Sequence, residues 1–137
     1  MEQVTVSGGT GVIDTNSAVT KPELPQALGI ALATGQLRRP LVQTLRPLLD
    51  LLADGPYRID GPERLEDERV LTPTGGWPPP DTTRVEYYRT AIQSGHRPVA
   101  VLLEAGDQGL ILDGHHKIAA YRAEEVSPSV LRISSSK

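Results

Sequence analysis

The sequence of 137 residues has no cysteine, no phenylalanine and only one tryptophan. Without cysteine the chain can form no disulfide, carry out no thiolate chemistry and build no cysteine-based zinc site. No apolar run approaches the roughly 20 residues that a membrane-spanning helix needs. The formal net charge of −3 lacks the basic excess that sequence-independent binding of nucleic acid requires. These absences argue against a membrane protein and against a general nucleic-acid-binding protein.

The N-terminal residues lack the basic start and the apolar stretch of a secretory signal peptide, so we expect a cytoplasmic protein. A chain of this length is most simply one domain with a modest core. Residues 1–21, which are rich in Ser, Gly and Thr, predict a flexible N-terminal arm or a short hairpin. The single domain is then expected over residues 22–137.

The first part of this domain, residues 22–55, has the pattern of a Leu-rich helical segment. Leucines recur at helical spacing until Gly35, and Pro40 opens a second run of leucines. Pro47 predicts that the second helix kinks there, or that one helix ends and another begins.

Residues 57–133 form the expected core of the domain. The pattern predicts a helix over residues 86–94 and strands over 98–103, 110–112 and 130–133. Helices cluster early in the chain and short strands late. This order favours an α+β fold, a small mixed sheet with packed helices, preceded by the Leu-rich helical segment.

The most informative stretch is an apolar run that breaks at Asp113-Gly114 and resumes as a helix former. It predicts a strand, a tight turn and a helix, with Asp113 as N-cap and Gly114 free to adopt an unusual backbone geometry. The first helical turn then carries the positive or titratable side chains of His115, His116 and Lys117. Such a helix N-terminus favours an anion, most simply a phosphate group. The alternative is a surface turn whose polar residues merely face water.

This stretch resembles the signature of the ParB/sulfiredoxin superfamily, in which a strand leads through a Gly-containing turn into a helix that binds nucleotide phosphates. Sulfiredoxins carry Gly-Gly-Cys-His-Arg, an aromatic residue and Ala-Ala-Tyr, whereas ParB proteins carry Gly-Glu-Arg-Arg. Relatives that phosphorylate free serine carry Asp-Gly-His-x-Arg, and this chain is closest to that form. The matching residues are Asp113-Gly114-His115-His116-Lys117, then Ile118 and Ala119-Ala120-Tyr121. The order of elements is also similar over about the last half of the chain.

Two positions depart from the superfamily pattern. His115 stands where sulfiredoxins have their reactive cysteine, which excludes that chemistry. Lys117 replaces the usual arginine, so the charge is kept while the planar guanidinium fork is lost. His115 and His116 are neighbours on a helix and point in different directions, so they do not predict a metal site.

The resemblance implies a nucleotide-binding protein that takes ATP, ADP or CTP with Mg²⁺. Gly114, His116 and Lys117 would hold the phosphates. Asp113 and His115 would act as a base or as a Mg²⁺-associated acid. The implied reaction is phosphoryl transfer to a small hydroxyl substrate, or nucleotide hydrolysis.

Glu86 is a further catalytic candidate, because the resemblance places an acid in the helix before the Pro-led strand. It also lies three residues after Thr83, as in a capping box, which would give it only a local structural role. Trp77, in a Pro-rich loop, predicts either packing of that loop on the core or stacking over a bound base.

The alternative function is a non-catalytic regulatory or protein-interaction module, of the toxin–antitoxin or partition type, that has kept the fold. Its ligand would then be a protein partner. Stabilisation by a nucleotide would separate the two hypotheses.

Overall fold

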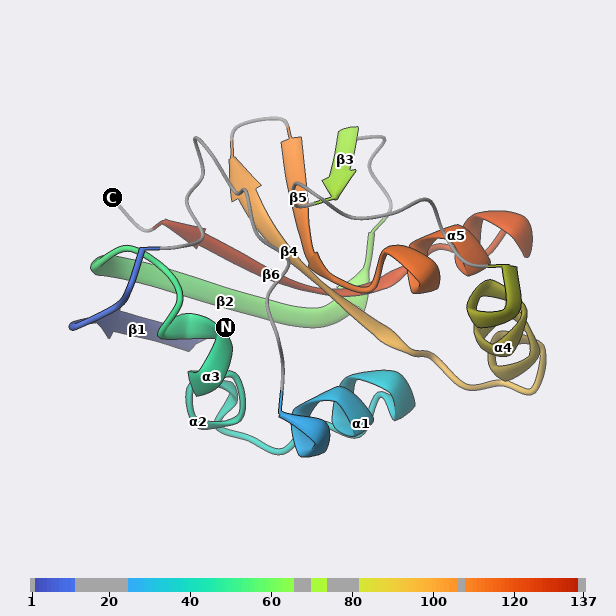
Figure 1. Cartoon of the computed structure of the whole chain (residues 1–137), viewed down its shortest axis with the longest axis horizontal. Helices are drawn as coiled ribbons and strands as arrows, with labels where there is room; N and C mark the ends of the chain where they lie inside the picture. The colour runs from blue at the N-terminus through green and yellow to red at the C-terminus, as the bar shows by residue number, and fades with distance from the viewer. Residues whose placement is uncertain (1, 12–24, 66–69, 74–81, 106–107, 136–137) are drawn as a thin grey trace.

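The computed structural model describes residues 2–11, 25–65, 70–73, 82–105 and 108–135. These residues confirm an α+β fold, in which helices pack on a six-stranded mixed sheet of order β1-β2-β6-β4-β5-β3 (Figure 1). The strands are β1 (Glu2–Val6), β2 (Gly55–Arg64), β3 (Val70–Pro73), β4 (Val99–Ala105), β5 (Gln108–Asp113) and β6 (Ser129–Ser135). The helices are α1 (Gln26–Thr34), α2 (Leu41–Thr44), α3 (Arg46–Leu49), α4 (Thr82–Gln93) and α5 (His115–Ala123).

The pairing of the strands brings two chain segments together at one end of the sheet. β4 is antiparallel to β5 and parallel to β6, while β3 is parallel to β5. The start of β4 therefore lies beside the end of β5, with Val101 in register with Asp113. α5 begins at this end of the sheet, immediately after β5.

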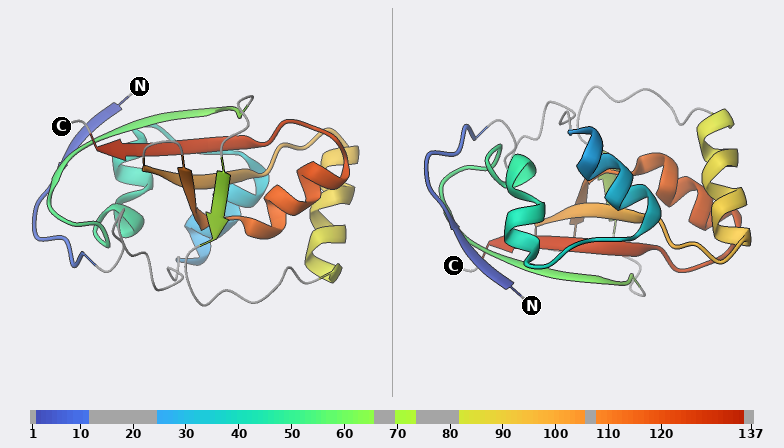
Figure 2. Two further views of the ribbon diagram at one scale, coloured as in Figure 1. Left: turned by 90° about the horizontal axis from the view of Figure 1, so that it is seen from above. Right: turned by 90° about the horizontal axis from the view of Figure 1, so that it is seen from below.

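The larger core lies between one face of the sheet and the helices α1, α2 and α3. Along β4 and β6 every second residue enters this core, as expected for strands that are covered on both faces. Figure 2 shows these three helices on the same side of the sheet. The buried leucines of the helices that join it are Leu28, Leu32, Leu41, Leu45, Leu48 and Leu49.

Two smaller clusters place α5 and α4. On the opposite face of the sheet, Ile118 of α5 packs with Ala100 and Leu102 of β4. Tyr121 of α5 and Ile92 of α4 form the third cluster, so the two helices lie side by side (Figure 1). The Tyr121 hydroxyl also donates a hydrogen bond of 2.6 Å to the carbonyl of Pro98. α4 is therefore held on α5, and α5 on the sheet.

Within the predicted helical segment over residues 22–55, the structure has helices at Gln26–Thr34, Leu41–Thr44 and Arg46–Leu49, and the second run of leucines divides at the expected place. α2 ends at Thr44 and α3 begins at Arg46, with Pro47 in its first turn. The predicted strands over residues 98–103, 110–112 and 130–133 are confirmed as β4, β5 and β6. Among the helices of the described ranges, none is long and apolar enough to cross a membrane.

The expectation of a flexible arm over residues 1–21 is wrong for Glu2–Val6, which forms the edge strand β1. Its backbone pairs antiparallel with β2, with Val4 opposite Tyr57, and Val6 is buried in the larger core. Val4, Thr5 and Val6 are themselves good strand formers, and the pairing with β2 holds them in a strand. Residues 12–21 lie outside the described residues, as does Trp77.

The side chain of Glu2 fixes this edge strand to the helical layer. Its carboxylate accepts hydrogen bonds from the backbone N–H groups of Leu41 at 2.7 Å and Val42 at 3.0 Å. Arg39 adds an ion pair of 3.5 Å. Burial alone would raise the pKa of Glu2, but the two N–H donors and the Arg39 charge outweigh it and hold the pKa below its ordinary 4.5. Glu2 thus acts as the N-terminal cap of α2 from a distant part of the chain.

Replacing Glu2 with glutamine should lower the free energy of unfolding by about 1 kcal/mol, because a neutral amide binds the α2 amides less strongly and loses the Arg39 contact. The ionised form is favoured in the folded state, so the stabilisation should be full above pH 4.5 and fade as the pH falls through the lowered pKa of Glu2. Urea unfolding at neutral pH and in acid measures this difference. Glu125→Gln, at an exposed position after α5, is the matched control. Equal stability of wild type and Glu2→Gln at neutral pH would contradict the capping role.

Candidate functional site

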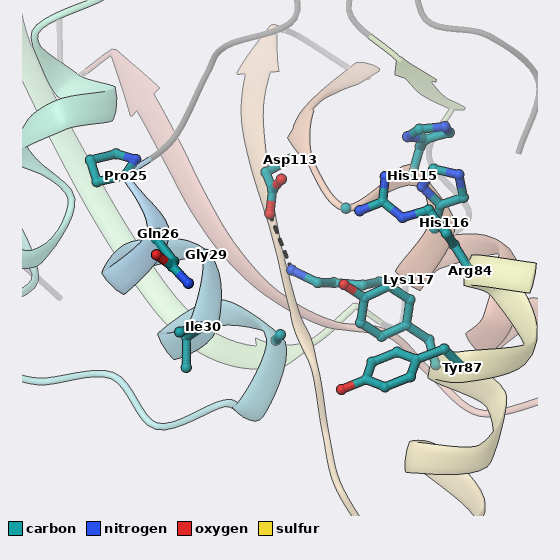
Figure 3. Close-up of a pocket in the computed structure, with 13 residues that line it drawn as sticks. Pro25, Gln26, Gly29, Ile30, Arg84, Tyr87, Asp113, His115, His116 and Lys117 are labelled. Carbon is teal, nitrogen blue, oxygen red and sulfur yellow. Dashed lines mark hydrogen bonds and ion pairs between the residues drawn. The ribbon is translucent and has the colours of Figure 1, made fainter. Parts of the chain in front are cut away.

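A pocket of about 370 Å³ opens where β5 passes into α5. Its lining residues come from α1, from α4 and from the turn that begins α5 (Figure 3). Because these elements are far apart in the sequence, the pocket exists only in the assembled fold. Five of the candidate residues line it together, namely Asp113, Gly114, His115, His116 and Lys117.

The turn between β5 and α5 is built on Gly114. This residue is the N-cap of α5 and has a φ of 107°, in the left-handed region that residues with a side chain avoid. A Cβ atom at this position would lie 2.9 Å from the Cβ atom of Ala100. The expected role of Asp113 as N-cap is therefore wrong: Asp113 is the last residue of β5, one position earlier.

Lys117 occupies the floor of the pocket, and the residue is only 3% exposed. Its ammonium donates hydrogen bonds to the carbonyl of Val99 at 3.0 Å and to Asp113 Oδ2 at 3.1 Å. Burial lowers the pKa of Lys117, and the Asp113 carboxylate opposes that shift in part. The amine has three N–H donors, and the contacts to described residues use two of them, so the third can serve a ligand.

His115 and His116 lie beside Lys117 in the first turn of α5. Their exposed fractions are 6% and 7%, and their ring centroids are 3.9 Å apart. The alternative of a turn whose polar side chains merely face water is therefore wrong. The first intrahelical hydrogen bond of α5 runs from Ile118 N–H to Gly114 C=O at 2.9 Å, so the positive end of the helix dipole lies at the pocket.

α4 supplies the second wall, with Arg84, Tyr87 and Tyr88. Burial raises the pKa of Tyr88; the Asp113 carboxylate adds to this shift and Arg84 opposes it. The ammonium of Lys117 lies 5.7 Å from the centroid of the same ring. Among the described residues that line the pocket, two cationic side chains, Arg84 and Lys117, thus occur with one carboxylate, which is a favourable arrangement for an anion.

Glu86 is not among the residues that line the pocket. Its carboxylate binds Arg89 Nη1 at 2.8 Å, one turn further along α4, and Arg89 Nε binds Glu124 at 2.8 Å. Because α4 presents Arg84 and Tyr87 to the pocket, the side chain at position 86 lies on another face of the helix. The expected grouping of Glu86 with Asp113 and His115 is therefore not observed.

Sequence reasoning missed the wall that α1 provides. Gln26, Gly29, Ile30 and Ala33 recur at helical spacing and line the pocket, on the side of the helix away from the buried Leu28. The sequence signal that could have indicated this wall is the helix face on which the small residues Gly29 and Ala33 flank the large apolar Ile30. Arg84 and Tyr87 gave no such signal, because their place depends on how α4 packs against α5.

The chain shows no match to any protein-family model, to any curated protein or to any solved structure. Within the described part of the chain, no group of three or more His, Cys, Asp or Glu residues is arranged to hold a metal ion. The interpretation of the pocket therefore depends on its own geometry and charge.

Replacing Gly114 with alanine should lower the free energy of unfolding by about 1–3 kcal/mol, because the residue would be strained at positive φ and would press on Ala100. Gly29→Ala is the control, since it lines the same pocket and a Cβ there meets nothing within 4 Å. On a helix it should be neutral or stabilising by up to about 1 kcal/mol. Thermal and urea unfolding compare the two variants. If both changed stability equally, the strained turn at Gly114 would be refuted.

Proposed function

We propose that the pocket binds the phosphate groups of a nucleotide. The observation that supports this most directly is the convergence of Arg84, Lys117 and the N-terminus of α5 on one cavity. Backbone N–H groups at a helix N-terminus and charge-assisted donors are the usual means by which proteins hold phosphate oxygens. A volume of about 370 Å³ falls in the range of small-molecule sites. Phosphate binding is also what the resemblance of the turn to the ParB/sulfiredoxin signature implies.

Asp113 and His115 give the pocket the groups for phosphoryl transfer or nucleotide hydrolysis. A carboxylate beside a bound triphosphate can take the proton of an attacking hydroxyl or contact Mg²⁺, which keeps several waters and needs only one or two protein carboxylates. Asp113 would serve in this way, with the phosphates completing the shell of the ion. Gly114, His116 and Lys117 would hold the phosphates themselves. A small hydroxyl compound is the proposed second substrate of such a transferase.

One observation favours the second candidate function, a non-catalytic binding module. The carboxylate that lines the pocket, Asp113, is already engaged by Lys117 at 3.1 Å, and Glu86 lies outside the pocket. A site with its acid held in an ion pair can bind a nucleotide, or the phosphate of a protein partner, without turning it over.

Removing either positive charge should weaken nucleotide binding. Arg84→Ala and Lys117→Met should each raise the Kd for ATP, ADP or CTP by about 10- to 100-fold, the scale of a lost charge-assisted hydrogen bond, and methionine keeps most of the buried volume of Lys117. Arg122→Ala is the matched control, because it removes the same charge from an exposed position on α5. Isothermal titration with and without Mg²⁺ gives the affinities. If no nucleotide bound at millimolar concentration, or if Arg84→Ala and Lys117→Met both bound like the Arg122→Ala control, the phosphate site would be misplaced.

Replacing Asp113 with asparagine separates binding from chemistry. The variant removes the negative charge that faces the phosphates, so it should bind nucleotide at least as tightly as wild type, with a gain of up to about 1–2 kcal/mol. If Asp113 takes part in the reaction, turnover or its Mg²⁺ dependence should be lost in the same protein. Titration and a phosphate-release assay are made on one preparation. Unchanged turnover in Asp113→Asn would remove Asp113 from the chemistry, and an absence of turnover in wild type would favour the binding module.

A further inference from the structure

Two large apolar side chains are left exposed among the residues whose burial is described, and both line the pocket. They are Ile30 of α1, which is 56% exposed, and Tyr87 of α4, which is 66% exposed. Exposing an isolated apolar side chain is ordinary, but two such residues at the mouth of one cavity form an apolar surface that a ligand can cover.

The two side chains belong to facing walls. In Figure 3, Ile30 lies on the α1 side of the pocket and Tyr87 on the α4 side, and the Asp113–Lys117 pair lies between these helices. The ring of Tyr87 meets that of Tyr88 edge to face, at a centroid distance of 5.2 Å and an angle of 79°. Since Tyr88 is partly buried against α5, this contact gives the exposed ring a defined support.

The α1 wall is shaped to let a flat group approach. Gly29 and Ala33 flank Ile30 with the smallest side chains, and a Cβ atom at Gly29 would meet nothing within 4 Å. Gln26, at the start of the same helix, contributes an amide that can both donate and accept a hydrogen bond. The pocket is therefore polar and cationic at the α5 turn, and apolar with one neutral amide at the Ile30–Tyr87 mouth.

We propose that this mouth holds the base of the nucleotide, stacked on Tyr87 and covered from the other side by Ile30, with Gln26 bonded to an edge of the base. The proposal rests on the phosphate site of the proposed function and assigns the remaining part of the same ligand. An aromatic ring carrying a phosphate chain is the ligand class that matches an apolar slot next to a cationic floor. Stacking on an aromatic ring tolerates any base, so Tyr87 supplies affinity, whereas Gln26 supplies the polar discrimination.

The test compares nucleoside triphosphates with inorganic tripolyphosphate, which carries the charge without the ring. Wild type should bind ATP, GTP, CTP or UTP at least about 10-fold more tightly than tripolyphosphate, because only the nucleotides gain the stacking contact. Tyr87→Ala should weaken binding of the preferred nucleotide by about 5- to 100-fold and leave tripolyphosphate binding unchanged. Ile30→Ala should act in the same direction with a smaller effect. Tyr87→Phe keeps the ring and should bind like wild type.

The outcomes distinguish the two proposals. If nucleotide and tripolyphosphate bind equally, and both lose affinity in Arg84→Ala but not in Tyr87→Ala, the phosphate site stands and the base site is overturned. If neither ligand binds wild type, the phosphate proposal fails and the base site fails with it. If Tyr87→Ala weakens both ligands equally, Tyr87 shapes the pocket without contacting a base. Circular dichroism and thermal unfolding check that Tyr87→Ala and Ile30→Ala, both changes at exposed positions, leave the fold intact.

Discussion

The buried amine of Lys117 joins three elements at the point where the pocket forms. Burying an ammonium group costs on the order of several kcal/mol unless hydrogen-bond partners replace the lost hydration. Asp113 at the end of β5 and the carbonyl of Val99 at the start of β4 supply these partners. The first turn of α5 is thereby fixed to both strands, and Gly114 provides the sharp bend that brings Lys117 back over the sheet. Without that bend the two imidazoles and the helix N-terminus would not share a cavity.

The parts of the site that the sequence predicts are those that depend on residues close together along the chain. The strand, turn and helix around Gly114 are local features, so the apolar run, the Asp-Gly break and the helix formers were enough to predict them. The sequence predicts Asp113 as the N-cap, one residue too early, because aspartate is a common N-cap residue. In the structure Gly114 is the N-cap in a left-handed conformation, and Asp113 instead forms an ion pair with Lys117. Arg84 and Tyr87 could not be predicted, since nothing near them in the sequence shows that α4 packs against α5.

For the fold as well, the elements set by neighbouring residues were predicted and those set by long-range contacts were not. The leucine spacing and Pro47 predicted the helical layer, because both act within a few residues along the chain. The edge strand β1 was not predicted, because its short Val4-Thr5-Val6 run is followed by the Ser-, Gly- and Thr-rich residues that dominate the composition of residues 1–21. Its conformation comes from pairing with β2 and from the carboxylate of Glu2, which binds amides of α2 about forty residues away along the chain. Such long-range partners leave no periodic signal in the sequence.

α1 connects the stability of the fold to the completeness of the site. One face of this helix places Leu28 and Leu32 in the larger core, and the opposite face presents Gly29 and Ile30 to the pocket. The helix has only nine residues and no acidic residue in its first turn, so tertiary packing rather than intrinsic preference keeps it folded. A ligand that touches α1 as well as α4 binds only when α1 is docked, and its binding energy therefore adds to the stability of that arrangement. The Leu-rich segment is thus a structural layer on one face and a wall of the pocket on the other.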